Sequence, residues 1–269
     1  MIWSVVSEDE MGSSTTSPTF GEYSKELGVD NVKLAVVNEL DNLSFVLPDD
    51  IVLLRTASRH LVRSIETRGA WTTAERYLTY RLAVDKMTMT QKLKIYGVRV
   101  APFYLLSEVV NGREYFVKPR FGNDSNVSTS NVCKTEEEVV RKVKEIKYLF
   151  GQESIICDNL SGREYTVACV RIGNDVHTYP MDINSPAKTL EYDIDSYLRE
   201  ESVNICERMG ILHHARIDFR SDADGNIFAI DINLIPSIGH DGKWAKCFRL
   251  AGLSYFDSIE SVIRTATKL

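Results

Sequence analysis

The feature that most constrains the fold is a pair of short alternating segments joined by a turn. His214–Arg220 and Asn226–Asn233 each alternate apolar and polar residues, and Asp224-Gly225 lies between them. Both turn residues tolerate positive φ, so the pattern predicts a β-hairpin with a two-residue turn in which Ala223 faces Asn226. The fold must therefore place this hairpin with its apolar side against a core.

The predicted register gives the hairpin one polar face. Asp218 falls opposite Asp231 and Arg216 opposite Asn233. The other face carries only apolar residues and is expected to be core: Ile217, Phe219, Ile230 and Ile232. Two carboxylates directly across a ladder lie roughly 5 Å apart and repel, unless a cation joins them. Carboxylate and amide oxygens suit Mg²⁺, so the face predicts a magnesium site; the alternative is the solvated side of an edge hairpin.

A second candidate feature is a lysine at the end of an apolar strand. Tyr115-Phe-Val-Lys-Pro119 is followed by a loop of small polar residues, 120–128. The stem of Lys118 lies between Val117 and Pro119, so its ammonium can point at a phosphate with help from loop N–H groups. The alternative is a solvated strand-end lysine. The chain has no GxxxxGK[ST] phosphate loop.

The remaining periodicities predict an α+β protein with an α/β-type start. Apolar runs predict buried parallel strands at Leu34–Val37 and Ile51–Leu54, followed by a helix at His60–Arg68 that ends at Gly69. Further helices are predicted from capping residues and glycine stops at Asp85–Tyr96, Thr135–Phe150, Asp195–Met209 and from Tyr255 onward. Further strands are predicted at Phe103–Leu106, Glu114–Lys118, Ser154–Cys157, Glu164–Arg171 and Val176–Asp182.

Composition excludes several classes of function. The formal charge of −6 argues against nucleic acid or an anionic membrane as the main partner. Five scattered cysteines without a CxxC indicate reduced thiols, and no apolar run approaches the length of a membrane span, so we expect a cytoplasmic protein. The histidines lack HExxH spacing. His213-His214 is interpreted as a satisfied surface pair, with a supporting role beside the metal ligands as the alternative. Gly12–Pro18 is interpreted as a solvated loop, with a substrate contact as the alternative. Lys188 is interpreted as a surface lysine, with a γ-phosphate contact as the alternative.

Taken in order, these segments resemble the ATP-grasp carboxylate–amine ligases, especially D-alanine–D-alanine ligase and the amino-acid ligases that modify protein or carrier termini. The resemblance covers about residues 85–250. It rests on Asp85-Lys86, Phe116-Val-Lys-Pro119, Leu160–Val167, Ala215-Arg-Ile-Asp218 and Ile230-Asp-Ile-Asn233. It implies an ATP-grasp fold with ATP held between two α+β lobes. The implied lobes are a short α/β N-terminal lobe at 1–80, a small central lobe at 81–157 and a C-terminal lobe with the magnesium hairpin at 158–269.

The resemblance also implies roles for individual residues. Lys86 and Lys118 would contact ATP phosphates, Glu164 would bind the ribose, and Arg216 would stabilise the transferring phosphoryl group. The adenine would be held by the segment Cys157, Asp158, Asn159 and Leu160, and Mg²⁺ by Asp218, Asp231 and Asn233. Cys157 departs from the glutamate that often binds the adenine amino group in this family, and Asp231 replaces the commoner glutamate.

The implied function is an ATP- and Mg²⁺-dependent ligase that forms an amide or peptide bond through an acyl phosphate. Its substrates would be a small carboxylate and an amine, an amino acid or peptide, with a carrier-protein terminus as a further option and a homodimer compatible with the sequence. Two alternatives remain open. A small-molecule kinase would use the same residues and release a phosphorylated product, and a non-catalytic nucleotide-binding module would not turn over ATP.

Overall fold

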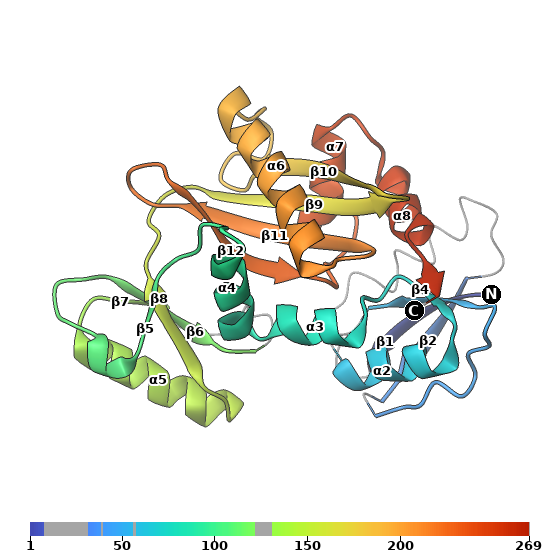
Figure 1. The fold of residues 1–269 in the computed structure, drawn as a ribbon, viewed down its shortest axis with the longest axis horizontal. Helices are drawn as coiled ribbons and strands as arrows, with labels where there is room; N and C mark the ends of the chain where they lie inside the picture. Colours follow the sequence, from blue (N-terminus) through green and yellow to red (C-terminus); the bar gives the residue numbers. More distant parts are fainter. Residues whose placement is uncertain (8–31, 39, 56–57, 122–130, 269) are drawn as a thin grey trace. The chain divides into compact units, whose positions relative to one another are not determined.

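The structure is a computed structural model that describes residues 1–7, 32–38, 40–55, 58–121 and 131–268 (Figure 1). The Gly12–Pro18 cluster and residues 122–130 of the loop after Lys118 lie outside the described residues. The chain divides into two compact units. The first comprises Met1–Arg81, Tyr165–Ile217 and Ile232–Leu269, and the second comprises Leu82–Glu164 and Asp218–Asp231. The three lobes expected from the sequence stay a prediction.

The N-terminal part of the first unit is a five-stranded sheet with the order β13-β4-β3-β1-β2. Its strands are β1 (Ile2–Ser7), β2 (Val32–Val37), β3 (Ile51–Leu54), β4 (Trp71–Thr72) and β13 (Thr267–Lys268). β2 and β3 both run parallel to β1, as predicted. β3 is buried, but β2 is an edge strand whose Leu34 and Val36 are 42% and 41% exposed, so the prediction that β2 is buried is wrong.

The helix beside this sheet begins and ends where the sequence predicts. α2 (Arg59–Arg68) is capped by the Ser58 side chain, which accepts the Leu61 amide at 3.3 Å. Gly69 closes the helix in the left-handed region at φ 62°, where a residue without Cβ is favoured. α3 (Tyr77–Val84) follows and was not predicted, because its apolar residues give it only weak amphipathic periodicity.

The second unit contains a four-stranded sheet with the order β5-β8-β6-β7. Its strands are β5 (Phe103–Tyr104), β6 (Tyr115–Pro119), β7 (Val132–Cys133) and β8 (Ser154–Asp158), and β6 pairs antiparallel with β7 and β8. α5 (Glu136–Phe150) packs against β6, β7 and β8 (Figure 1). Tyr115 and Val117 are fully buried in the core beneath it. Phe116 and Lys118 alternate with them and so project from the opposite face of β6.

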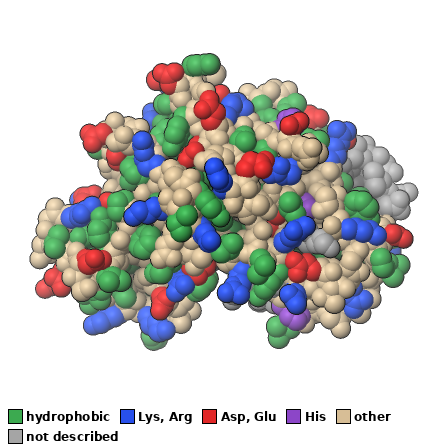
Figure 2. All heavy atoms as spheres, in the orientation of Figure 1, with side chains coloured by type: hydrophobic (Ala, Val, Ile, Leu, Met, Phe, Trp, Pro, Cys, Tyr) green, Lys and Arg blue, Asp and Glu red, His purple; other side chains and the backbone are tan. Residues whose placement is uncertain are grey.

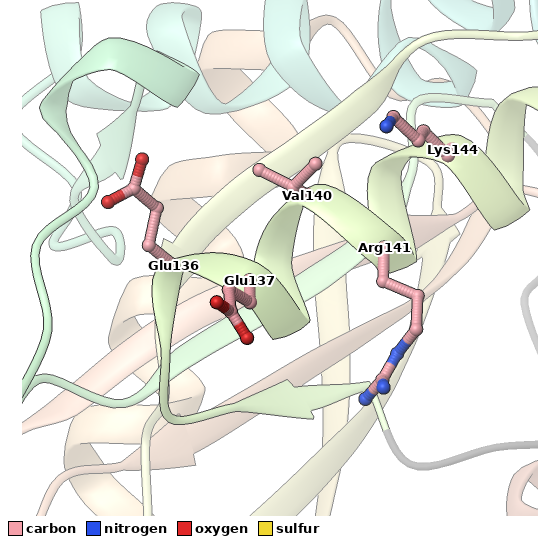
Figure 3. A pocket seen from close by; sticks show the side chains of 5 residues that line it. All are labelled: Glu136, Glu137, Val140, Arg141 and Lys144. Carbon is pink, nitrogen blue, oxygen red and sulfur yellow. The ribbon is translucent and has the colours of Figure 1, made fainter.

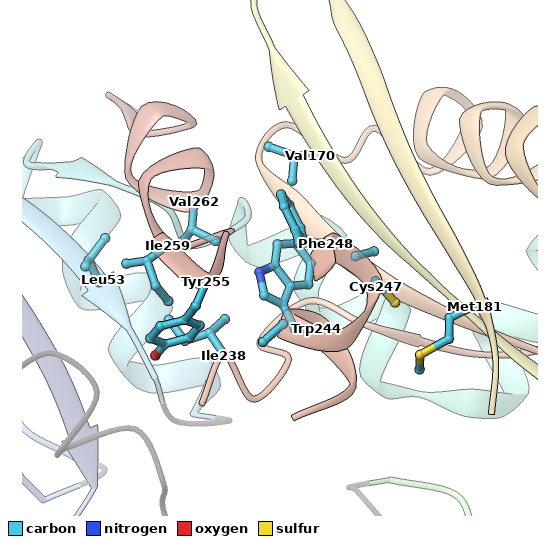
Figure 4. Packing of buried hydrophobic residues seen from close by; sticks show 12 residues of the cluster. Leu53, Val170, Met181, Ile238, Trp244, Cys247, Phe248, Tyr255, Ile259 and Val262 are labelled. Carbon is cyan, nitrogen blue, oxygen red and sulfur yellow. The ribbon is translucent and has the colours of Figure 1, made fainter. Parts of the chain in front are cut away.

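A third sheet has the order β10-β9-β11-β12. Its strands are β9 (Glu164–Ile172), β10 (Asp175–Asp182), β11 (His214–Ser221) and β12 (Ile227–Asn233). α6 (Tyr192–Met209) and α7 (Lys243–Leu250) pack against β10, and α7 also packs against α8 (Tyr255–Arg264). In the first unit, Trp244 and Phe248 of α7 pack with Ile259 and Val262 of α8 (Figure 4). This apolar cluster forms a core of the first unit.

The α+β class is therefore confirmed, since helices pack on sheets with mostly antiparallel pairs. The predicted strand at Phe103–Leu106 is shorter than expected, because Leu106–Glu108 turns into a 3₁₀ helix (η2). Within the described ranges, no helix is both long and apolar enough to cross a membrane. Basic and acidic side chains are interspersed over the face shown in Figure 2.

Candidate nucleotide and metal site

A small cavity in the second unit collects most of the predicted nucleotide-binding residues. Its lining residues come from the segment before β5, from β6, from β8 with the segment that follows it, from the end of β11 and from the middle of β12: Ala101, Phe116, Lys118, Cys157, Asp158, Asn159, Leu160, Arg220 and Ile230. Lys118 and the segment 157–160 thus line one cavity, and their nucleotide-binding role stays a prediction. The cavity has a volume of about 60 Å³.

Lys118 brings an ammonium group to the lining of the cavity. Its Nζ donates a hydrogen bond of 3.1 Å to the carbonyl oxygen of Ile230. A phosphate oxygen could replace the Ile230 carbonyl as the acceptor of this hydrogen bond. Because the phosphate is charged and the carbonyl is neutral, the new hydrogen bond would be the stronger one. Strand alternation explains the position, because Lys118 shares the cavity face of β6 with Phe116.

The segment 157–160 is held in place by its own backbone and side chains. The amide of Asp158 donates to the Pro102 carbonyl at 3.0 Å, and the amide of Asn159 donates to the Glu114 carbonyl at 3.1 Å. The Asp158 carboxylate accepts two hydrogen bonds of 2.8 Å from Arg113. These hydrogen bonds tie the segment to the residues around it, and the Asp158 carboxylate already has a partner in Arg113.

The Cys157 thiol also lies in this segment, and its Sγ donates to the carbonyl of Phe116 at 3.3 Å. Burial raises the pKa of Cys157, an effect that nearby Lys118 opposes, so the thiol is neutral at physiological pH. A neutral thiol engaged with a carbonyl offers a base amino group no strong acceptor.

Lys86 is buried at the start of α4 (Lys86–Ile95), which Asp85 caps by accepting the Thr88 amide. Arg120 donates to both carboxylate oxygens of Asp85 at 2.8 Å. Burial alone would raise the pKa of Asp85, but the hydrogen bonds from Arg120 and Thr88 outweigh it and the pKa is lowered. The charged Asp85–Arg120 pair therefore fixes the first turn of α4 to the residue that follows β6. Lys86 itself does not line the cavity.

Glu164 begins β9, and the residues before it are tied to the end of β11. The Arg163 amide donates to Ser221 Oγ at 2.8 Å, and the Ser221 amide donates to the Arg163 carbonyl at 2.8 Å. Gly162 lies so close to this pair that an added Cβ would meet Ser221 Oγ at 2.2 Å. Glu164 is half-buried and does not line the cavity, so its ribose-binding role stays a prediction.

The hairpin turn differs from the prediction. The Asp222 amide donates to the Asn226 carbonyl at 2.9 Å, and the Gly225 amide donates to the Asp222 carbonyl at 3.3 Å. The loop therefore has three residues, 223–225, and Asp222 faces Asn226. The predicted two-residue turn is wrong because the Asp222 carboxylate accepts the amides of Asp224 and Asn226, which stabilises the wider turn.

The core face of the hairpin is confirmed with one exception. Ile217 and Phe219 are fully buried, and Ile232 is 4% exposed. Ile230, however, lines the cavity and accepts the Lys118 hydrogen bond through its carbonyl. The register that set Asp218 directly opposite Asp231 assumed a two-residue turn. Because the loop has three residues, that register no longer follows from the turn.

The predicted metal ligands lie on the adjacent strands β11 and β12. Asp218 is only 6% exposed and, with Asp231, belongs to the second unit, whereas Arg216 and Asn233 belong to the first. Within the described ranges, no hydrogen bond or ion pair engages the half-buried carboxylate of Asp231. No group of three His, Cys, Asp or Glu able to hold a metal occurs in the described part of the chain. The metal-ligand assignment stays a prediction.

His213 and His214 are buried, not solvated, and the surface-pair interpretation is wrong. His213 Nδ1 lies 2.8 Å from the Thr265 carbonyl, and its amide donates to Glu75 Oε1 at 2.7 Å. Burial lowers the pKa of His213 to about 4 and that of His214 well below its usual value, so both rings are neutral. Glu75, which sequence reasoning missed, also accepts the Leu212 amide at 2.9 Å and so anchors the start of β11.

Two further hollows have linings that share no residue with the cavity that Lys118 lines. Lys188 is exposed, as predicted, and lines a cavity of about 100 Å³ in the first unit beside Arg199 and Cys247. A hollow of about 390 Å³ lies over the outer side of α5, where Glu137 and Arg141 project from the same face of the helix (Figure 3). No predicted site residue lines this second hollow, whose described lining comes from α5 alone.

Solved structures with the same fold are D-alanine ligases. A D-alanyl-alanine synthetase A from Vibrio cholerae superposes with a TM-score of 0.77 at 13% identity, covering 97% of this chain and 96% of that one. A D-alanine–D-alanine ligase from Bacillus anthracis complexed with ATP superposes with a TM-score of 0.74 at 14% identity, covering 98% and 96%. The chain therefore has the ATP-grasp fold of the D-alanine–D-alanine ligases.

Sequence comparison points to the same relatives, although no protein-family model matches the chain. The D-alanine–D-alanine ligase of Stutzerimonas stutzeri is 24% identical over 223 residues, covering 74% of this chain and 70% of that protein. The enzyme of the same name from Streptococcus pneumoniae strain CGSP14 is 22% identical over 218 residues, covering 70% of this chain. This chain spans 62% of the length of the Streptococcus protein. The chain is thus related to the D-alanine–D-alanine ligases.

Proposed function

We propose that the chain is an ATP- and Mg²⁺-dependent carboxylate–amine ligase. The observation that carries the proposal is the cavity of the second unit, which gathers Lys118 and the segment 157–160 in one wall. The fold supports it, because a relative with this fold was solved with ATP. In this proposal the base enters the cavity and the triphosphate follows Lys118 and Lys86, while Glu164 binds the ribose hydroxyls.

The residues of the hairpin fit a magnesium ion. Asp218 and Asp231 supply hard carboxylate oxygens from adjacent strands, and the Asp231 carboxylate is not engaged by any other described residue. Asn233 would add an amide oxygen, although its Oδ1 already accepts the Ile235 amide at 2.9 Å. When bound, the ion would neutralise charge on the β- and γ-phosphates.

The proposed reaction has two steps. A carboxylate oxygen of the acid attacks the γ-phosphorus of ATP and displaces ADP, forming an acyl phosphate. An amine then attacks the acyl carbon and displaces phosphate, forming the amide. Lys118, Lys86 and Arg216 would stabilise the charge on the phosphoryl group in flight, since phosphoryl transfer depends mainly on placement and electrostatics.

The proposed substrates are an amino acid or short peptide as acid and as amine. The terminus of a carrier protein offers the same two groups and is included as a further proposed substrate. We also propose a homodimer, supported by the exposed apolar residues Leu34 and Val36 on edge strand β2. Sedimentation velocity measures the oligomeric state directly, and a monomer at all concentrations would remove this part of the proposal.

The test is ATP consumption with acid alone, with acid plus hydroxylamine, and with acid plus amine. An acyl phosphate gives a hydroxamate with hydroxylamine and an amide with the correct amine. Arg216→Ala is expected to retain ATP binding and to lose roughly 10²–10³ in rate, as when one donor to a transition-state charge is removed. Arg208→Ala, on the exposed last turn of α6, is the control and should keep full activity.

Two results would contradict the proposal. A stable phosphorylated product with no amide under any pairing of acid and amine would indicate a kinase. Tight ATP binding without ADP formation under any condition would indicate a non-catalytic nucleotide-binding module.

A further inference from the structure

The cavity of the second unit is also lined by an arginine that was not among the predicted site residues. Arg220 lies near the end of β11 and lines the cavity together with Cys157 and Ile230. Its Nε is buried and has no hydrogen-bond partner among the described residues. A buried N–H group without an acceptor costs free energy. A ligand whose oxygen or nitrogen accepts from this N–H removes that cost and therefore binds more tightly.

The other polar side chains of the cavity each already have a hydrogen-bond partner. The Asp158 carboxylate is held by Arg113 at 2.8 Å and by the Tyr104 hydroxyl at 3.1 Å. The Asn159 side chain donates to Glu114 at 2.8 Å. The Cys157 thiol donates to the Phe116 carbonyl. The side chains of this wall are thus engaged, while Arg220 has a donor to offer.

This balance of donors and acceptors distinguishes the purine bases. Adenine presents an amino group at position 6, which needs an acceptor, whereas guanine and hypoxanthine present a carbonyl there beside the acceptor N7. A guanidinium donates to both of these atoms in a planar, two-bond arrangement. The apolar lining residues Ala101, Phe116, Leu160 and Ile230 suit either ring.

We propose that Arg220 selects the base and that the cavity binds 6-oxopurine nucleoside triphosphates at least as well as ATP. This inference rests on the proposed function, because it takes the cavity to be the site of the base. Arg220 donates to the carbonyl oxygen or N7 of the ring, and the backbone of 157–160 holds the opposite edge. The ligase then uses GTP or ITP as phosphoryl donor.

The test is binding of ATP, GTP and ITP with Mg²⁺ by calorimetry, without acid or amine. The wild-type protein is expected to bind GTP and ITP within threefold of ATP or more tightly. Arg220→Met keeps a similar side-chain volume and is expected to weaken GTP and ITP binding by about 10- to 100-fold while changing ATP binding less than threefold. Arg141→Met, on the exposed face of α5 in the same unit, is the control and should change none of the three.

Two outcomes would overturn the proposal. Binding of ATP 100-fold tighter than GTP by the wild-type protein would show an adenine site. An equal loss for all three nucleotides in Arg220→Met would show that the guanidinium only stacks on the ring. If Arg220→Met does not fold, the relative affinities of the wild-type protein for ATP, GTP and ITP test the proposal without the variant. The assay needs no turnover, so a chain that binds GTP but makes no amide would contradict the ligase and leave base selection standing.

Discussion

Replacing the buried Glu75 by glutamine is expected to change how the stability of the first unit depends on pH. Glu75 is 1% exposed, and its carboxylate accepts the amides of Leu212 and His213 at the start of β11. Glutamine keeps one oxygen that can accept both amides, because Oε1 alone already contacts them at 3.0 and 2.7 Å. Glu75→Gln therefore removes the titration and keeps the hydrogen bonds.

The magnitude follows from the pKa of Glu75, which is raised from 4.5 to about 7. Burial raises it, and the two amide hydrogen bonds and the charges of Arg171 and Arg76 only partly oppose this. Because the folded protein holds the proton more tightly, the stabilisation is complete below pH 4.5 and is lost as pH rises through about 7. A shift of this size corresponds to about 3 kcal/mol of unfolding free energy over that window.

The assay is urea unfolding followed by the fluorescence of Trp244, which is fully buried in the same unit. His213 and His214 have lowered pKa values and add stability as pH rises, so the informative quantity is the difference between variant and wild type. Relative to wild type, Glu75→Gln should gain about 3 kcal/mol between pH 4.5 and 7.5. Glu137→Gln, at the exposed start of α5, should gain nothing. A Glu75→Gln variant with the same pH dependence as wild type would refute the reasoning.

Three further predictions concern the site and its supports. Glu164→Ala is expected to weaken binding of ATP with Mg²⁺ by about 1.5–3 kcal/mol in calorimetry, and unchanged affinity would remove the ribose assignment. Asp218→Asn should lose Mg²⁺-dependent turnover while the protein without metal melts at the same or a slightly higher temperature; a clear decrease would favour a structural ion pair. Gly162→Ala should destabilise the second unit by about 1–3 kcal/mol in thermal unfolding, because a Cβ would meet Ser221 Oγ at 2.2 Å. Adding Ser221→Ala should not restore stability, since backbone oxygens also lie at 2.5 and 2.7 Å.

The sequence by itself determined the local elements and the residue types of the site. Asp85 caps α4 and Thr135 caps α5 because a side-chain oxygen satisfies an amide three residues on, which is a contact within one turn. Gly69 and Gly210 end helices in the left-handed region for an equally local reason. Alternation along a single strand was enough to predict that Ile217 and Phe219 are core.

Only the tertiary structure decided which distant residues meet. Phe116, Arg220 and Ile230 line the nucleotide cavity although they lie on three separate strands, and no local pattern marks them as neighbours. The burial of His213 depends on acceptors supplied by Glu75 and Thr265, which are far from it in the sequence. The physical reason is that the free energy of a buried polar group depends on its partner, and such partners come from elsewhere in the chain.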